Sequence, residues 1–280
     1  MSQRRRDQKR AVVTGAASGL GRAFVLELAQ KSERARIVAC DIDMAGLEET
    51  AALARARGAE VVPVRCDVAS EDAVAALAQA ADEALGEIDL VVNNAGVATG
   101  GEVGETPLED WRWIVSINLM GVVHGCHFFA PRLRKQGHGA ILNVASAAGL
   151  IATPGMAAYN ATKFGVVGLS EALYLELKDV GVGVTVLCPT FFPTNIVASA
   201  RGPVDASLKK VATRLMAASR LDAGDVARAA LRASERGELY SVPMNDARAL
   251  WALKRLAPEQ WSARIGPAIH RLTRARFSRQ

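Results

Sequence analysis

Short runs of apolar residues alternate along the chain with longer segments in which apolar and polar residues recur at helical spacing. The runs predict strands over 10–14, 36–40, 60–66, 88–94, 140–146, 183–189 and 238–243. Helical patterns begin near Gly19, Met44, Ser70, Pro107, Ala157 and Asp222. Continuous apolar strands separated by helices are typical of a parallel sheet covered on both faces. Right-handed crossovers then predict a doubly wound α/β fold of about seven strands.

The same pattern predicts how the 280 residues are organised. Residues 10–243 would form one Rossmann-like domain with helices on both faces of its sheet, including a substrate loop over about 190–220. Residues 1–9 form a basic tail, and residues 244–280 form a basic, amphipathic C-terminal extension.

Composition indicates an ordinary soluble protein, with 50% apolar and 22% charged residues. No apolar run reaches the roughly 18 residues that span a bilayer. The basic start leads into a short apolar run and a Gly-rich turn, so it indicates a tail rather than a signal peptide, and a cytoplasmic location is expected.

The four cysteines lie apart in apolar stretches and are interpreted as reduced packing residues. The histidines form no ligand pattern, so no metal is expected.

The net charge of +5 is concentrated at the two ends of the chain. Residues 1–10 carry +4 and residues 245–280 carry +6, which leaves −5 for the body, so no nucleic-acid partner is expected. In the extension, one side of the helical pattern carries Trp251, Trp261, Ile265, Ile269 and Leu272, and much of the other carries Arg264, Arg271 and Arg274. This pattern predicts helices that pack on the body or on a neighbouring subunit. The alternative is peripheral contact with an anionic membrane.

Functional candidates should follow strands, because doubly wound sheets bind ligands beyond the carboxyl ends of their strands. The motif TGAASGLG, Thr14 to Gly21, joins the first strand to the first helix. Gly15 would permit the turn, Gly19 would let a pyrophosphate approach the backbone, and Gly21 would let helix and sheet pack closely. The spacing G-x-x-x-G-x-G differs from the commoner G-x-G-x-x-G, but its placement predicts dinucleotide binding.

Asp41 ends the second strand, twenty residues after Gly21. A carboxylate there can accept hydrogen bonds from a ribose 2′-hydroxyl and would repel a 2′-phosphate, which favours NAD over NADP. Arg22 lies nearby and could soften that preference. Asp67 and Val68, after the third strand, are candidates for adenine contact, although Asp67 also fits a turn or helix cap.

Three further polar motifs follow strands or lie within helices. NNAG, Asn93 to Gly96, ends the fourth strand, where its asparagines could tie loop to strand or contact a cofactor. Ser146 ends the fifth strand. Asn118 lies in the middle of a predicted helix, which is unfavourable unless its side chain is satisfied elsewhere.

The stretch YNATK places Tyr159 and Lys163 on one face of a helix. At about 4 Å and an effective dielectric of about 20, the lysine charge would favour the phenolate by roughly 4 kcal/mol, or about three pKa units. That would bring the pKa of Tyr159 to near 7, where a general acid or base works best.

With these motifs in this order, the segment from Arg10 to Pro243 resembles the short-chain dehydrogenase/reductase family in its form with an Asn-Ser-Tyr-Lys tetrad. The resemblance implies that Tyr159 exchanges a proton with the substrate oxygen and that Ser146 hydrogen-bonds that oxygen. Lys163 would lower the pKa of Tyr159 and bind the nicotinamide ribose, and Asn118 would hold a water that links Lys163 to solvent. The implied cofactor contacts are Gly15, Ser18, Gly19, Leu20, Gly21, Asp41, Asp67, Val68, Asn94, Ala95, Gly96, Tyr159, Lys163, Pro189 and Thr194. The family usually has Pro-Gly after the sixth strand, whereas this chain has Pro189-Thr190, so the path of that loop is expected to differ.

The predicted function is NAD-dependent hydride transfer to or from a hydrophobic secondary alcohol or ketone. Candidate residues of an apolar substrate pocket are Leu150, Met156, Phe191, Phe192, Ile196, Val197 and Met216, which could instead pack the loop onto the body. The alternatives are an NADPH-preferring carbonyl reductase and a nucleotide-sensing scaffold without turnover. The resemblance also implies a homodimer or homotetramer.

Overall fold

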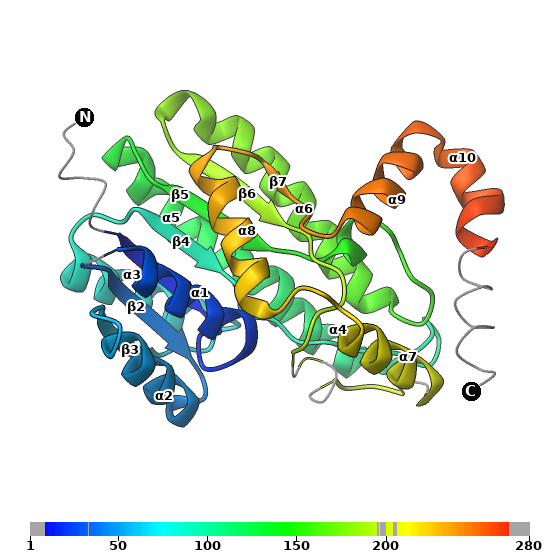
Figure 1. The fold of residues 1–280 in the computed structure, drawn as a ribbon, viewed down its shortest axis with the longest axis horizontal. Helices are drawn as coiled ribbons and strands as arrows, with labels where there is room; N and C mark the ends of the chain where they lie inside the picture. Colours follow the sequence, from blue (N-terminus) through cyan, green and yellow to red (C-terminus); the bar gives the residue numbers. More distant parts are fainter. Residues whose placement is uncertain (1–8, 33, 195, 197–199, 204–205, 269–280) are drawn as a thin grey trace.

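The computed structural model of the protein describes residues 9–268 except 33, 195, 197–199 and 204–205. Seven parallel strands form one sheet in the order β3-β2-β1-β4-β5-β6-β7, which confirms the predicted doubly wound fold (Figure 1). The strands are β1 (Arg10–Thr14), β2 (Arg36–Asp41), β3 (Glu60–Arg65), β4 (Leu90–Asn93), β5 (Ala140–Val144), β6 (Gly183–Leu187) and β7 (Tyr240–Ser241). The strand order changes direction between β1 and β4, and this switch point is where such sheets bind ligands.

The interior strands are apolar because both faces of the sheet are covered. Val12, Val38 and Val91 have no exposed surface. The edge strand β7 is shorter than predicted and pairs with β6 through two residues. Pro243 follows closely and has no N–H to donate to a strand ladder.

Two sets of helices cover the sheet. The helices α1 (Gly19–Lys31), α2 (Met44–Arg55) and α8 (Ala223–Glu235) share one face, where α1 contacts both of the others. The other face carries α3 (Glu71–Leu85), α5 (Gly121–Gln136) and α6 (Ala157–Leu177). Because α8 lies beside α1, the last crossover, from β6 to β7, passes over the face opposite to that of the three before it. This crossover is therefore an exception to the right-handed crossovers that the sequence pattern predicts.

Helix α4 (Leu108–Val115) continues through a π-helical turn, Ser116–Met120, into α5. The combined helix, Leu108–Gln136, is 29 residues long and apolar enough by composition alone to cross a membrane. Core helices of globular proteins pass the same test, and this one contacts α3, α6 and the sheet. We therefore interpret it as a layer of the α/β fold.

The segments around the substrate side contain more helix than predicted. Helix α7 (Ala206–Ala217) lies inside the predicted 190–220 loop. After β7 come α9 (Asn245–Leu256), α10 (Pro258–Gln260) and a π-helical turn, Trp261–Ile265. Helix α9 packs on the body of its own chain, where the rings of Trp251 and Tyr240 lie 4.7 Å apart. Ile269, Arg271, Leu272 and Arg274 of the predicted amphipathic pattern lie outside the described residues.

Candidate active site

A cavity of about 1650 Å³ lies at the carboxyl ends of the central strands. Its wall is formed by the segments that follow β1, β2, β3, β4, β5 and β6, together with part of α6. Predicted residues in this wall are Gly15, Ser18, Gly19, Leu20, Gly21, Asp41, Asp67, Val68, Asn94, Ala95, Gly96, Ser146, Met156, Tyr159, Lys163, Pro189, Phe191, Phe192, Thr194, Ile196 and Met216. The fold thus brings together residues that are up to 201 positions apart in the sequence.

The glycine turn is packed tightly on one side and open on the other. Gly15 has φ +65°, and a Cβ on it would lie 2.7 Å from the Cα of Ala95. A Cβ on Gly21 would lie 1.9 Å from the carbonyl oxygen of Gly15, so only glycine lets α1 approach the turn this closely. Gly19 has φ +53° and nothing within 4 Å of a Cβ position, at the N-terminus of α1. This open cradle at a helix N-terminus fits a diphosphate.

Asn94 fastens the end of β4 to the glycine turn. Its Nδ2 donates to the carbonyl oxygens of Thr14, at 2.8 Å, and Gly15, at 3.1 Å. The Thr14 hydroxyl accepts in return from the backbone N–H of Asn94 at 2.9 Å. Of the two roles left open by the sequence, the structural one is therefore present, and direct cofactor contact stays a prediction.

Asp41 faces the cavity with its carboxylate held by backbone groups. One oxygen accepts from the N–H of Ala17 at 2.9 Å, and the other accepts from the N–H of Asp43 at 3.0 Å. Arg22 was a candidate to pair with the 2′-phosphate of NADP and so to reduce the preference for NAD. Its guanidinium donates instead to Glu49 at 2.7 Å and to the carbonyl of Ala17. Arg22 does not line the cavity.

Asp67 has the turn role considered for it, and its contact with adenine stays a prediction. Its carboxylate accepts from the N–H of Ala69 at 2.9 Å, which is a turn, while the helix cap of α3 is Ser70. Asp67 and Val68 nevertheless both line the cavity near Asp41 and Ile42.

Hydrogen bonds with the backbone of Val97 explain how Asn118 is tolerated in the middle of a helix. The Asn118 side chain accepts from the N–H of Val97 at 2.7 Å and donates to the carbonyl of Val97 at 2.9 Å. Asn118 is fully buried. A Cβ on Gly96 would lie 3.3 Å from Asn118 Oδ1 and 3.5 Å from Lys163 Nζ, so both groups approach the same point of the wall. The contact of Asn118 with a water that links Lys163 to solvent stays a prediction.

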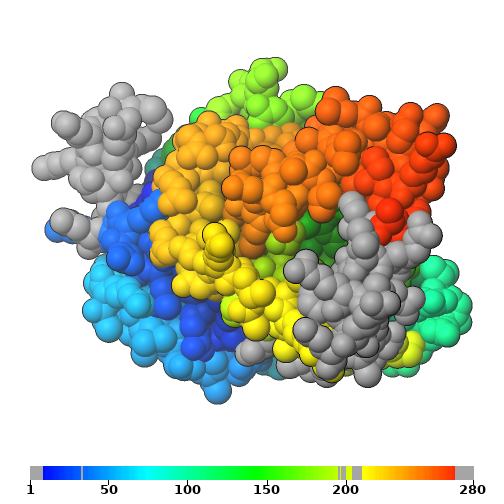
Figure 2. All heavy atoms as spheres, turned by 45° about the vertical axis from the view of Figure 1, so that its right-hand side comes forward, coloured from blue at the N-terminus to red at the C-terminus, as the bar shows by residue number. Residues whose placement is uncertain are grey.

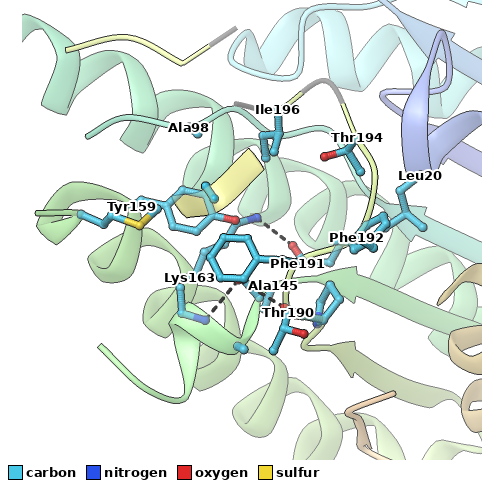
Figure 3. A pocket seen from close by; sticks show the side chains of 18 of the residues that line it. Leu20, Ala98, Ala145, Tyr159, Lys163, Thr190, Phe191, Phe192, Thr194 and Ile196 are labelled. Atoms are coloured by element: carbon cyan, nitrogen blue, oxygen red, sulfur yellow. Dashed lines mark hydrogen bonds between the residues drawn. The ribbon is translucent and has the colours of Figure 1, made fainter. Parts of the chain in front are cut away.

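Tyr159 and Lys163 project from α6 into the cavity wall (Figure 3). Lys163 is 3% exposed, its Nζ donates to the carbonyl of Val144 at 3.0 Å, and this nitrogen lies 5.7 Å from the centre of the Tyr159 ring. Ser146, in extended conformation at the end of β5, accepts from the N–H of Ala148 at 3.1 Å.

The pKa values correct one prediction. Burial raises the pKa of Tyr159, and a hydrogen bond with Ser146 acts in the opposite direction. Burial also lowers the pKa of Lys163 from 10.5 to about 8. The protein's own residues therefore raise the Tyr159 pKa instead of lowering it, because desolvation of the buried phenol outweighs the hydrogen bond with Ser146.

Leu150 corrects another prediction. It is 4% exposed and packs in the main apolar core, and it does not line the cavity. A single 3₁₀ turn, Ala147–Gly149, follows β5 and directs Leu150 inward, while the next residue, Ile151, reaches the wall. Val197 lies outside the described residues. Thr190, in place of the usual glycine, also lines the cavity.

Sequence reasoning missed part of the wall. Helix α7 contributes Val211 and Leu215, and the C-terminal extension contributes Leu250, Trp261 and Pro267. The tryptophans at helical spacing were the available signal, but spacing alone does not say which of them faces a cavity.

The sequence model of the short chain dehydrogenase family matches residues 9–204. The chain therefore belongs to the short-chain dehydrogenase/reductase family, whose members are oxidoreductases. It is 40% identical over 187 residues to a CLA biosynthesis dehydrogenase/reductase of Lactiplantibacillus plantarum, a match that covers 66% of this chain and 65% of that relative. The match thus spans less than two thirds of the relative's length.

Two further similarities cover more of the chain. A D-threitol dehydrogenase of Mycolicibacterium smegmatis is 42% identical over 209 residues, which is 74% of this chain and 79% of the relative. The crystal structure of a short-chain dehydrogenase/reductase from Burkholderia phymatum in complex with NAD superposes with a TM-score of 0.85 at 38% identity. It covers 91% of this chain and 95% of that one.

Proposed function

We propose that the protein transfers a hydride between NAD and a hydrophobic secondary alcohol or ketone, with Tyr159 as the general acid or base. One observation carries the proposal: Tyr159, Ser146 and Lys163 line the same cavity as the open glycine turn. A proton donor and a diphosphate cradle in one cavity are what alcohol–ketone chemistry with a dinucleotide requires.

The cofactor would be held by the glycine turn, by Asp41 and by the Asp67–Val68 segment. A bound nicotinamide supplies the hydride acceptor or donor. NAD is favoured over NADP for two reasons. The Asp41 carboxylate faces the cavity, and Arg22 is engaged by Glu49, so no arginine at that position is available for a 2′-phosphate. The similar Burkholderia phymatum protein binds NAD.

The polar residues have distinct roles in the proposed reaction. Tyr159 gives a proton to the substrate oxygen in reduction and takes it in oxidation, and Ser146 positions that oxygen by a hydrogen bond. The pKa of Lys163, about 8, lies close to neutral pH. Lys163 can therefore hold or release a proton next to Tyr159 as the tyrosine gives up or takes up its own. The nearby Asn118 amide supports this end of the site by bonding both backbone groups of Val97.

The remaining wall favours a hydrophobic substrate. Phe191, Met156 and Ile196 line the cavity near Tyr159, and Met216 lines it from α7. Such walls with few polar groups are typical of sites for small apolar molecules. The active protein is expected to be a homodimer or homotetramer, as the family resemblance implies.

The test is the substitution Tyr159→Phe, which removes the hydroxyl and keeps the ring. We expect NADH formation from secondary alcohols, followed at 340 nm, to fall by about 10²–10⁴-fold or more, while NAD binding measured by calorimetry stays within about threefold.

The chain offers a matched control for this substitution. Tyr174 on the same helix and Lys178, which follows the last residue of that helix, repeat the spacing, with Lys178 Nζ 5.9 Å from the ring centre, but neither lines the cavity. Tyr174→Phe should keep full turnover. Normal turnover in Tyr159→Phe would refute the mechanism, and NAD binding without turnover of any alcohol by the wild type would favour the sensing scaffold.

A further inference from the structure

The C-terminal segment, residues 245–268, is fixed to the body of its own chain at defined points. Trp251 contacts Tyr240, with ring centres 4.7 Å apart. Lys254 Nζ donates to the carbonyl of Leu150 at 2.6 Å and lies 4.8 Å from the centre of the Phe164 ring. These contacts hold α9 beside α6, so the chain after it is positioned next to the cavity.

Trp261 is buried without being part of the core. It is 8% exposed, yet among the described residues it belongs to neither of the two clusters of buried apolar side chains. It lines the cavity instead, and a Cβ on Gly266 would lie 3.3 Å from its indole nitrogen. Its own helical turn therefore lies against the edge of the ring that carries the nitrogen, while Trp261 also lines the cavity. Trp251, by contrast, packs against the main core.

Helix α7 supplies the facing wall. Val211, Leu215 and Met216 line the cavity from α7, and Leu250, Trp261 and Pro267 line it from the C-terminal segment. Figure 2 shows this outer part as a hollow between the orange C-terminal segment and the yellow α7 region. The same cavity reaches inward to Phe191 and Tyr159. The cavity thus forms a channel that leads away from Tyr159, lined by these apolar side chains and also by polar residues such as Arg220 and Ser262.

We infer that the substrate carries an extended apolar body, such as a long alkyl chain, which lies between α7 and the C-terminal segment and contacts Trp261. This inference rests on the proposed function and names the class of alcohol or ketone that the site prefers. A short or polyhydroxylated substrate would leave these apolar side chains in contact with water, whereas an alkyl body would cover them. The family model matches residues 9–204, so α7 and the C-terminal segment both lie after the matched range.

The test is a homologous series of 2-alkanols from 2-butanol to 2-dodecanol, assayed with NAD. In the wild type, kcat/KM should rise about fourfold for each methylene that enters the channel. Trp261→Ala should lower the ratio of kcat/KM for 2-dodecanol to that for 2-butanol by at least tenfold, and Trp261→Phe should have an intermediate effect. Circular dichroism and NAD affinity check that each variant is folded.

Leu256→Ala is the matched control, because Leu256 lies in the same segment but is 85% exposed and outside the cavity wall. It should show the chain-length dependence of the wild type. A wild-type kcat/KM that stays flat or falls with chain length would overturn the inference and leave the proposed function standing. Equal losses for all alcohols in Trp261→Ala would also overturn it. Absence of NADH formation with every member of the series would instead refute the proposed function.

Discussion

Replacing Lys163 by methionine is expected to stabilise the folded protein at pH 7 even though it removes a residue of the proposed site. Lys163 is 3% exposed, and burial lowers its pKa from 10.5 to about 8. That difference corresponds to roughly 3 kcal/mol by which folding disfavours the charged amine. Methionine has a similar length and no charge to desolvate. It forfeits the bond to the Val144 carbonyl, which contributes about 1 kcal/mol.

The net expectation is a gain of about 2 kcal/mol at pH 7, equivalent to a rise in Tm of roughly 4 °C or more. The gain should depend on pH in a defined direction. Unfolded Lys163 titrates at its ordinary value, so the folded state binds fewer protons between about pH 8 and 10.5. The wild-type penalty is therefore complete below about pH 8 and disappears as the pH rises through 10.5.

The measurement is thermal denaturation of the cofactor-free protein, followed by circular dichroism at several pH values from 7 to 10. The difference in Tm between Lys163→Met and wild type should shrink as the pH rises. Lys178→Met is the control, because this exposed lysine occupies the equivalent position beside Tyr174. A variant that melts below wild type at pH 7, or a difference that does not change with pH, would show that burial does not penalise the Lys163 charge.

Two further substitutions test other parts of the site. Asp41→Ala should raise the affinity for NADP relative to NAD by about tenfold, or ~1.4 kcal/mol, as measured by calorimetry, whereas Asp43→Ala, which alters the neighbouring cap of α2, should leave the ratio unchanged. An unaltered ratio in Asp41→Ala would remove Asp41 from cofactor selection. Asn118→Ala would leave the half-buried N–H and carbonyl of Val97 without their side-chain partner, and denaturant unfolding should show a loss of about 1 kcal/mol or more. Unchanged stability would mean that another group replaces the amide.

Much of the site could be predicted because its residues follow strands. The glycine turn, Asp41 and Ser146 lie at or just after the ends of parallel strands, and the carboxyl ends of such strands meet at one edge of the sheet. Leu150 and Trp261 could not be placed in this way. The direction of the Leu150 side chain depends on one 3₁₀ turn, and the environment of Trp261 depends on how α9 docks on α6. Neither leaves a periodic pattern in the sequence.

Two tyrosine–lysine pairs, one near the start of α6 and one at its C-terminal end, show what the sequence determines and what the tertiary structure decides. In both pairs the lysine nitrogen lies close to the ring, at 5.7 Å from Tyr159 and 5.9 Å from Tyr174, because the helical repeat fixes the approach of positions four apart. The sequence thus determines each pair. Only Tyr159 and Lys163 are buried against the ends of β4 and β5, where the glycine turn and Ser146 converge. Burial and the meeting of distant segments come from packing of the whole sheet, and they distinguish the candidate site from an ordinary surface pair.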